Sequence, residues 1–183
     1  KKDLQVNQIT PLLFRTMHET GRAMALISND SERTFATYLG AAIDLSVEDI
    51  THDLFEGYDY LYIEGYLVQN KEMIEKALRL ASKEGLTVCL DLASYNVVEE
   101  NLSFFKSLLE KYVDILFANE EEIKALTGLS PEAGANEVKA LVEVAVIKMG
   151  AEGSFCISEQ GTVRIGVRPC NPIDTTGAGD LFA

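Results

Sequence analysis

Short apolar runs alternate with segments of helical periodicity through most of the sequence, and this alternation limits the fold more than any other feature. The apolar runs have the length of strands and lie at residues 60–63, 86–90, 115–118 and 144–147. Between them, apolar side chains recur at helical spacing over residues 73–81, 102–112, 123–126 and 138–142. Strands separated by helices of this length predict a parallel sheet with helices on both faces.

Two further pairs of runs predict antiparallel hairpins. One pair lies at 23–28 and 33–39 around a polar turn, and the other at 155–158 and 162–165. Between the first hairpin and the alternating region, Ser46 precedes the acidic stretch 47–49, which predicts an N-cap and the first turn of a helix.

The composition of the 183 residues suits one domain with a real core. A net charge of −13 argues against binding to nucleic acid or to an anionic membrane, since both require basic patches. No signal peptide or apolar run of membrane-spanning length is present. Cys89, Cys156 and Cys170 lie far apart without a C-x-x-C spacing, so we expect a reduced, cytoplasmic protein. The chain starts without Met and stops soon after Asp180, and we expect it to be a fragment.

The stretch 174–182, Asp-Thr-Thr-Gly-Ala-Gly-Asp-Leu-Phe, combines small residues with a carboxylate where a helix should begin. Glycines let the backbone approach a ligand closely, and the first N–H groups of a helix favour anions. Asp180 would stand beside this cradle and could accept a proton from a hydroxyl group. Such a pairing is what phosphoryl transfer to an alcohol requires, although the residues alone also fit a Gly-rich turn into a capped helix.

These nine residues resemble the C-terminal signature of the PfkB carbohydrate kinases, the group of ribokinase and adenosine kinase. The resemblance implies a ribokinase-like three-layer α/β/α fold with a mostly parallel sheet. Residues of about 20–45 would form a small β-lid, and 46–183 the α/β nucleotide-binding core. It makes Asp180 the catalytic base and Gly177, Ala178 and Gly179 the anion hole. The N-terminal part of the family, with the first strands and most sugar contacts, is absent here.

Asn119 and Glu122 match the N-x-x-E motif of the family at the start of a predicted helix. By resemblance, Asn119 lies near the nucleotide phosphates and Glu122 holds Mg²⁺, largely through water. The same two residues fit a capping box, which would satisfy two N–H groups at the helix start. The two roles are compatible, so both stay open.

Lys148, Gly150 and Gly153 resemble the nucleotide loop of the family, in which a strand ends in a short G-x-x-G segment beside ATP. Many members have Thr where this chain has Lys148, whose ammonium could pair with phosphate or with a surface carboxylate. The two glycines also fit an ordinary turn. In many relatives, residues matching Asp174 and Thr176 hold a monovalent cation; alternatively, Asp174 forms an Asx-turn.

No other motif competes with this interpretation. Asp91, His18 and His52 belong to no metal-ligand spacing, and no G-x-S-x-G, Walker or complete G-x-G-x-x-G sequence is present. A P-loop kinase and a classical dinucleotide dehydrogenase are therefore disfavoured.

The resemblance implies an ATP-dependent phosphotransferase acting on a primary alcohol of a sugar or nucleoside, with Mg²⁺ as a cofactor and K⁺ as a further candidate. The expected partners are ATP, the acceptor and a second copy of the chain through the lid. Two alternatives remain: a nucleotide- or sugar-binding module of the same fold without transfer, and a structural fragment with no site. The chain by itself is expected to be inactive.

Overall fold

The computed structural model describes residues 4, 6–27, 33–168 and 177–183. The chain forms two compact units, residues 1–49 and 50–183. Each unit is described by itself below.

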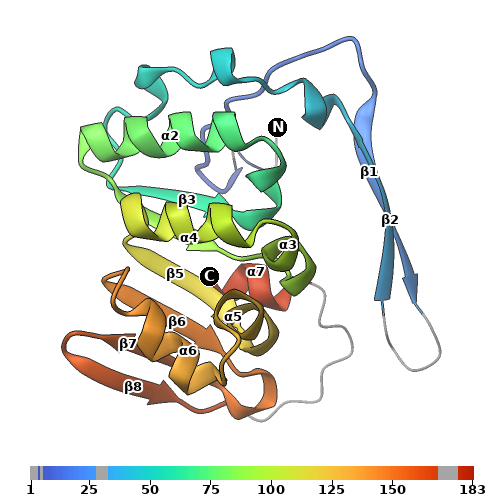
Figure 1. Ribbon diagram of the computed structural model, residues 1–183. Helices are drawn as coiled ribbons and strands as arrows, with labels where there is room; N and C mark the ends of the chain where they lie inside the picture. Colours follow the sequence, from blue (N-terminus) through green and yellow to red (C-terminus); the bar gives the residue numbers. More distant parts are fainter. Residues whose placement is uncertain (1–3, 5, 28–32, 169–176) are drawn as a thin grey trace. The chain divides into compact units, whose positions relative to one another are not determined.

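The first unit contains the predicted hairpin. Strands β1 (Thr20–Ile27) and β2 (Arg33–Gly40) pair antiparallel in a two-stranded sheet (Figure 1). Two 3₁₀ helices follow, η1 (Ala41–Asp44) and η2 (Val47–Asp49). Ser46 directly precedes η2, whose first turn carries Glu48 and Asp49, and its N–H and hydroxyl both donate to the Asp49 carboxylate, at 2.8 and 2.9 Å. The acidic stretch thus forms a single 3₁₀ turn and no longer helix.

The second unit is built on a six-stranded sheet in the order β3–β4–β5–β6–β7–β8. The first four strands are parallel and the last two are antiparallel, so the predicted parallel sheet and the second hairpin are confirmed. The bounds are Tyr60–Glu64 (β3), Thr87–Asp91 (β4), Ile115–Asn119 (β5), Val144–Lys148 (β6), Ser154–Ser158 (β7) and Gly161–Ile165 (β8).

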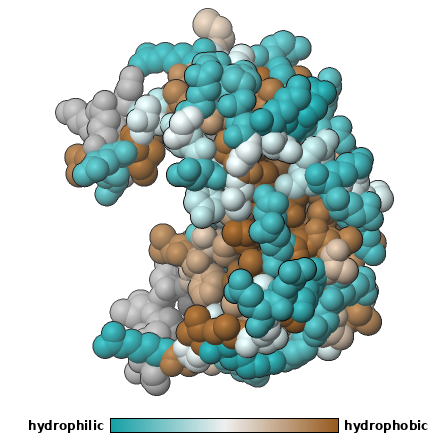
Figure 2. Space-filling model, turned by 90° about the vertical axis from the view of Figure 1, so that its left-hand side faces the viewer, coloured by the Kyte–Doolittle hydropathy of each residue, from teal (hydrophilic) through white to brown (hydrophobic). Residues whose placement is uncertain are grey.

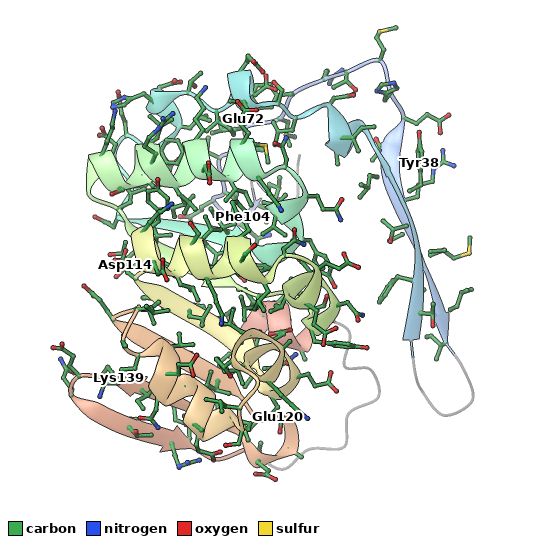
Figure 3. The ribbon with its side chains drawn as sticks, in the orientation of Figure 1. Tyr38, Glu72, Phe104, Asp114, Glu120 and Lys139 are labelled. Atoms are coloured by element: carbon green, nitrogen blue, oxygen red, sulfur yellow. The ribbon has the colours of Figure 1, made fainter. Side chains whose placement is uncertain are left out.

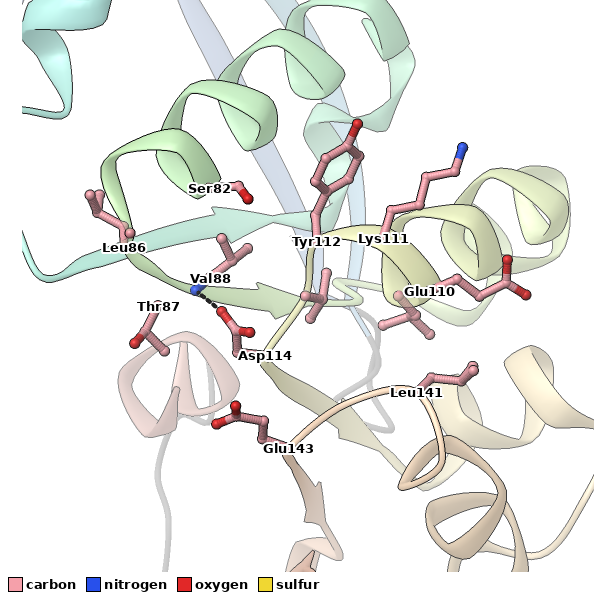
Figure 4. A pocket seen from close by; sticks show the side chains of 13 residues that line it. Ser82, Leu86, Thr87, Val88, Glu110, Lys111, Tyr112, Asp114, Leu141 and Glu143 are labelled. Carbon is pink, nitrogen blue, oxygen red and sulfur yellow. Dashed lines mark hydrogen bonds between the residues drawn. The ribbon is translucent and has the colours of Figure 1, made fainter.

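Helices lie on both sides of this sheet, which is the three-layer α/β/α arrangement. α2 to α6 cover one side and the short α7 lies on the other (Figures 1 and 4). The α-helices are Lys71–Glu84 (α2), Tyr95–Glu100 (α3), Leu102–Lys111 (α4), Glu120–Thr127 (α5), Pro131–Val138 (α6) and Ala178–Phe182 (α7). The 3₁₀ helices are His52–Leu54 (η3), Gly65–Gln69 (η4) and Gly150–Glu152 (η5).

Local signals explain where most helices begin and end. The Asn70 side chain accepts the Met73 N–H at the start of α2, and Gly85 ends that helix at a φ of 76°. The helix expected over 138–142 is displaced: α6 starts at Pro131 and ends at Val138. A Pro at the first helical position is a start signal, so the periodicity at 138–142 marks the turn into β6 instead.

The core lies between the sheet and helices α2 to α6. Its largest side chains that are fully buried include Phe105, Leu116, Ile123 and Ile147. On β5 and β6, burial alternates along the strand, and the side chains facing away from these helices are half-buried. Figure 2 views the unit from the amino ends of β4 to β6, where hydrophobic side chains gather among polar ones. No helix in the part of the chain described here has the length and hydrophobicity to cross a membrane.

Candidate active site

The last residues of the four parallel strands are all polar and lie along one edge of the sheet. They are Glu64, Asp91, Asn119 and Lys148. The register pairs Glu64 with Asp91 on β3 and β4, and Asn119 with Lys148 on β5 and β6. In open α/β sheets, ligands bind beyond the carboxyl ends of the strands. This edge is therefore the candidate site.

A buried ion pair joins two of these strand ends. The Lys148 ammonium donates to Asp91 Oδ2 at 2.7 Å, and the two side chains are only 15% and 7% exposed. The other carboxylate oxygen, Oδ1, accepts the Ala93 N–H at 2.9 Å. Of the two partners that the sequence left open for Lys148, the structure shows a carboxylate, but a buried one.

Asn119 and Glu122 form the complete capping box at the start of α5. Asn119 Oδ1 accepts the N–H groups of Glu121 and Glu122, both at 2.9 Å. In return, the Asn119 N–H and Nδ2 donate to the two Glu122 carboxylate oxygens at 2.7 and 2.8 Å. This reciprocal pattern fixes a carboxylate and an amide at the tip of β5.

The Glu122 carboxylate is suited to help hold a divalent cation through water. It is 3% exposed, and this burial raises its pKa even though the Asn119 backbone and the Lys148 charge favour the anion. A desolvated carboxylate with a second lone pair on each oxygen gains from a nearby dication. Among the described residues, no group of three or more acidic, His or Cys side chains is arranged to hold a metal directly.

The Gly-rich turn brings its carboxylate to the same edge. Gly177 adopts a φ of 74° and its carbonyl accepts the Leu181 N–H at 2.9 Å, which begins α7. A Cβ on Gly179 would lie 3.8 Å from the Lys148 ammonium, so the ion pair stands beside the first turn of α7. The N–H groups of residues 178–180 precede the first hydrogen bond within the helix, from the Leu181 N–H to the Gly177 carbonyl.

Asp180 is close enough to the strand ends to act on their ionisation. Burial, followed by the charges of Asp180 and Asp91, raises the pKa of Glu64. Burial and the charges of Asp91, Glu64 and Asp180 raise the pKa of Tyr62 to about 12. Asp180 on α7 therefore lies within electrostatic range of Glu64 and Tyr62 on β3.

The loop after β6 contains two glycines with different constraints. Gly153 adopts a φ of 94°, and a Cβ there would lie 2.1 Å from the Ile165 carbonyl oxygen, so β8 needs Gly at this position. Its carbonyl accepts the Met149 N–H at 2.8 Å and closes the loop. Gly150 has a φ of 48° and open space around the Cβ position. The turn and the close approach of β8 thus explain why residue 153 is a glycine. At Gly150, by contrast, no atom of the residues that the structure describes lies near the Cβ position.

The structure brings together most of the residues that the sequence singled out. Asp174 and Thr176, with their predicted cation site, lie outside the described residues, as does Cys170. Sequence reasoning gave no role to Asp91 and did not consider Glu64 as a site residue. The available signal was their position, since a polar residue directly ends each strand.

The two histidines take part in exposed pairs instead. His18 pairs with Asp44, and His52 with Glu56 and Glu84.

A cavity of about 390 Å³ lies at the opposite end of the strands (Figure 4). It is formed by the turns that lead into β4, β5 and β6. Asp114 and Glu143 project toward it in Figure 4, and Asp114 Oδ2 accepts the Val88 N–H at 2.7 Å. That bond ties the start of β4 to the start of β5, which is a structural role far from the strand tips described above.

Comparison with known proteins agrees with this geometry. Guanosine-inosine kinase of Escherichia coli K12 is 35% identical over 143 residues, which cover 74% of this chain and 33% of that protein. The crystal structure of adenosine kinase from Sinorhizobium meliloti superposes with a TM-score of 0.88 at 31% identity, over 99% of this chain and 58% of that one. A putative ribokinase II from E. coli, solved in complex with ATP and Mg²⁺, shares the fold at a TM-score of 0.77 and 22% identity, over 87% and 55% of the two chains.

The chain thus spans between a third and three fifths of the length of these relatives. The family model for the pfkB family carbohydrate kinases matches residues 3–183, which is nearly the whole chain. Together with the sheet order and the polar strand tips, this match shows that the chain belongs to the pfkB family of carbohydrate kinases.

Proposed function

We propose that the full-length protein transfers the terminal phosphoryl group of ATP to a primary hydroxyl of a nucleoside or sugar. The observation that carries the proposal is the convergence of Asp180, the Lys148–Asp91 pair and the Asn119–Glu122 box on one edge of the sheet. Phosphoryl transfer uses a base, a positively charged side chain and a carboxylate near the metal ion, and Asp180, Lys148 and Glu122 are suited to these three roles.

In this mechanism, the Asp180 carboxylate accepts the proton of the acceptor hydroxyl as its oxygen attacks phosphorus. The N–H groups of residues 177–180 and the Lys148 ammonium stabilise the charge on the phosphoryl oxygens during transfer. Glu64 lies near Asp180 and is suited to accept a hydrogen bond from a second hydroxyl of the acceptor. Asn119 and Gly150 face the rest of the phosphate chain, and Gly153 shapes that loop.

Mg²⁺ bound through water near Glu122 would neutralise charge on the phosphates. Asp174 and Thr176 remain our candidates for a monovalent cation, so K⁺ dependence is part of the proposal. The free thiols of Cys89 and Cys156 support a reducing, cytoplasmic setting.

The acceptor class is best sought among purine nucleosides first. Of the three relatives described above, those at 35% and 31% identity are named for guanosine, inosine and adenosine, whereas the one at 22% is named for ribose. We therefore propose assays of ATP consumption with adenosine, guanosine, inosine, ribose and fructose derivatives, each with and without K⁺. ATP binding without consumption for every acceptor would favour the alternative, a binding module of the same fold.

The decisive variant is Asp180→Asn, which keeps the shape of the side chain and removes the base. Turnover should fall by about 10²–10⁴-fold while the Kd for ATP stays nearly unchanged. Glu120→Gln is the matched control, because Glu120 is an exposed carboxylate at the start of α5 (Figure 3). Turnover of Asp180→Asn like that of the control would refute the assigned base.

We also propose that the β1–β2 hairpin acts as a lid and pairs with the hairpin of a second copy. Both of its faces carry apolar side chains that are at least 47% exposed: Met24, Leu26, Ile27, Phe35, Tyr38 and Leu39. An isolated two-stranded hairpin is marginal in water, so these side chains need a partner. Light scattering should give a dimer for the full-length protein, and Phe35→Ser with Ile27→Ser should shift it toward monomer; a monomeric wild type would exclude this pairing.

A further inference from the structure

The Lys148 ammonium uses one of its N–H donors within the part of the chain that the structure describes. Within the described residues its one hydrogen-bond partner is Asp91, at 2.7 Å, although an ammonium carries three N–H donors. The Lys148 side chain is only 15% exposed, and its Nζ lies 3.8 Å from the Cβ position of Gly179. Among the residues that the structure describes, two of its three donors therefore have no protein acceptor beside the first turn of α7.

Asp91 is held in place from several sides. Its Oδ1 accepts the Ala93 N–H at 2.9 Å, in a turn where Ala93 adopts the left-handed φ of 67°. The next residue, Leu92, donates its N–H to the Phe117 carbonyl on β5 at 3.1 Å. A Cβ on Gly65 would lie 2.7 Å from the Asp91 carbonyl oxygen, so η4 packs directly on this backbone. The carboxylate is thus a fixed point, whereas the lysine side chain that it binds is long and flexible.

We propose that Asp91 is a positioning residue, which acts through Lys148 and does not itself contact ATP. By binding one N–H of the ammonium, it fixes the other two where the phosphoryl group is transferred. Both Asp91 oxygens are already hydrogen-bonded to protein donors, so its carboxylate faces Lys148 and the Ala93 turn. This inference rests on the proposed function, because it requires an anionic ligand at α7.

The prediction separates kcat from binding. Asp91→Asn keeps the shape and the bond from Ala93 but releases the ammonium, so kcat should fall about tenfold, the size typical of coupled contacts. The Kd for ATP, measured by titration calorimetry, should stay equal or become tighter, since a negative charge has been removed near the phosphates. A role for Asp91 in phosphate binding itself would instead weaken the affinity.

A double-mutant cycle in the full-length protein tests whether Asp91 acts through Lys148. We expect Lys148→Met to lower kcat, and Asp91→Asn to cause no further loss in the Lys148→Met background. If Asp91→Asn lowers kcat by the same factor in both backgrounds, or leaves it unchanged in the wild type, the positioning role is wrong. Glu120→Gln again serves as the control.

Lys148→Met leaves the buried Asp91 carboxylate without its cationic partner, and this variant could fail to fold. The double variant has no unpaired charge and is then compared directly with Asp91→Asn. Their kcat values should agree within about threefold, because a released ammonium adds little to a step that needs accurate placement. A kcat for Asp91→Asn about a hundredfold above the double variant would show that Lys148 works without Asp91. A wild type that neither binds nor consumes ATP would overturn the proposed function itself, whereas an active wild type with additive variants overturns only the role of Asp91.

Discussion

Replacing Asn119 by Ala tests how much the capping box contributes, because this side chain both accepts and donates. The change removes the acceptor of the Glu121 and Glu122 N–H groups, and an N-cap of this kind contributes about 1 kcal/mol. It also removes the Nδ2 donor to Glu122, which leaves a buried carboxylate one bond short at about 1–3 kcal/mol. We therefore expect Asn119→Ala to lower the free energy of unfolding by about 2–4 kcal/mol.

Two further variants separate the contributions. Asn119→Ser retains a capping oxygen but cannot reach the Glu122 carboxylate, so it should be more stable than Asn119→Ala by about 1 kcal/mol. Ile123→Val on the same helix is fully buried and should cost about 1 kcal/mol without touching a polar group. Urea midpoints at unchanged m-value give the three free energies.

The same series tests whether Asn119 also contacts ATP. If it does, Asn119→Ala should weaken ATP binding while Ile123→Val leaves it unchanged. Equal losses of stability for the Ala and Ser variants, or a loss below about 0.5 kcal/mol for Ala, would refute the energetic role assigned to the box.

Three more changes follow from the backbone and from Glu122. Gly153→Ala should lower the free energy of unfolding by more than about 2 kcal/mol, because the new Cβ would clash with the Ile165 carbonyl oxygen. Gly161→Ala, at a φ of 124° in open space, is the control for backbone strain alone. Similar losses of stability in the two variants would argue against the clash. Ala93→Gly should raise the melting temperature, because the left-handed φ of Ala93 costs about 1 kcal/mol and Gly adopts it without that strain. An unchanged melting temperature would mean that the turn is not strained. Burial raises the pKa of Glu122 in the folded state. Its contribution to the free energy of unfolding is therefore complete below the ordinary carboxyl pKa and is lost as the pH rises through the raised pKa of the folded state. The unfolding free energy of the wild type minus that of Glu122→Gln should accordingly fall as the pH rises above the ordinary carboxyl pKa of about 4, and a flat or rising difference would contradict this.

The sequence predicted the elements of the sheet well because each one depends on local chemistry. Apolar runs mark the strands, and Asn70, Gly85 and Gly128 mark helix ends through their own backbone preferences. The displaced α6 shows the limit of periodicity: the turn after Val138 buries Val142 at helical spacing without being helical.

The site was predictable only where a continuous motif carries it. Asp180, Asn119 and Glu122 stand in recognisable local patterns, and the capping box was open to both interpretations because its geometry is entirely local. Asp91 was not recognised, since its partner Lys148 lies 57 residues further along the chain. Only the adjacency of β4, β5 and β6 brings the two together, and a pattern read residue by residue does not contain that adjacency.

The neighbour-by-neighbour strand order has a consequence for synthesis on the ribosome. From β3 to β8, every strand pairs with the strand that precedes it in the sequence. Each new strand therefore adds to a sheet edge that has already been synthesised, and none of these six is inserted later between two others. The turn at Gly177 follows all six strands, so Asp91 and Lys148 are in place before it emerges. Among the elements of this sequence, α7 is therefore the last to join the polar strand ends.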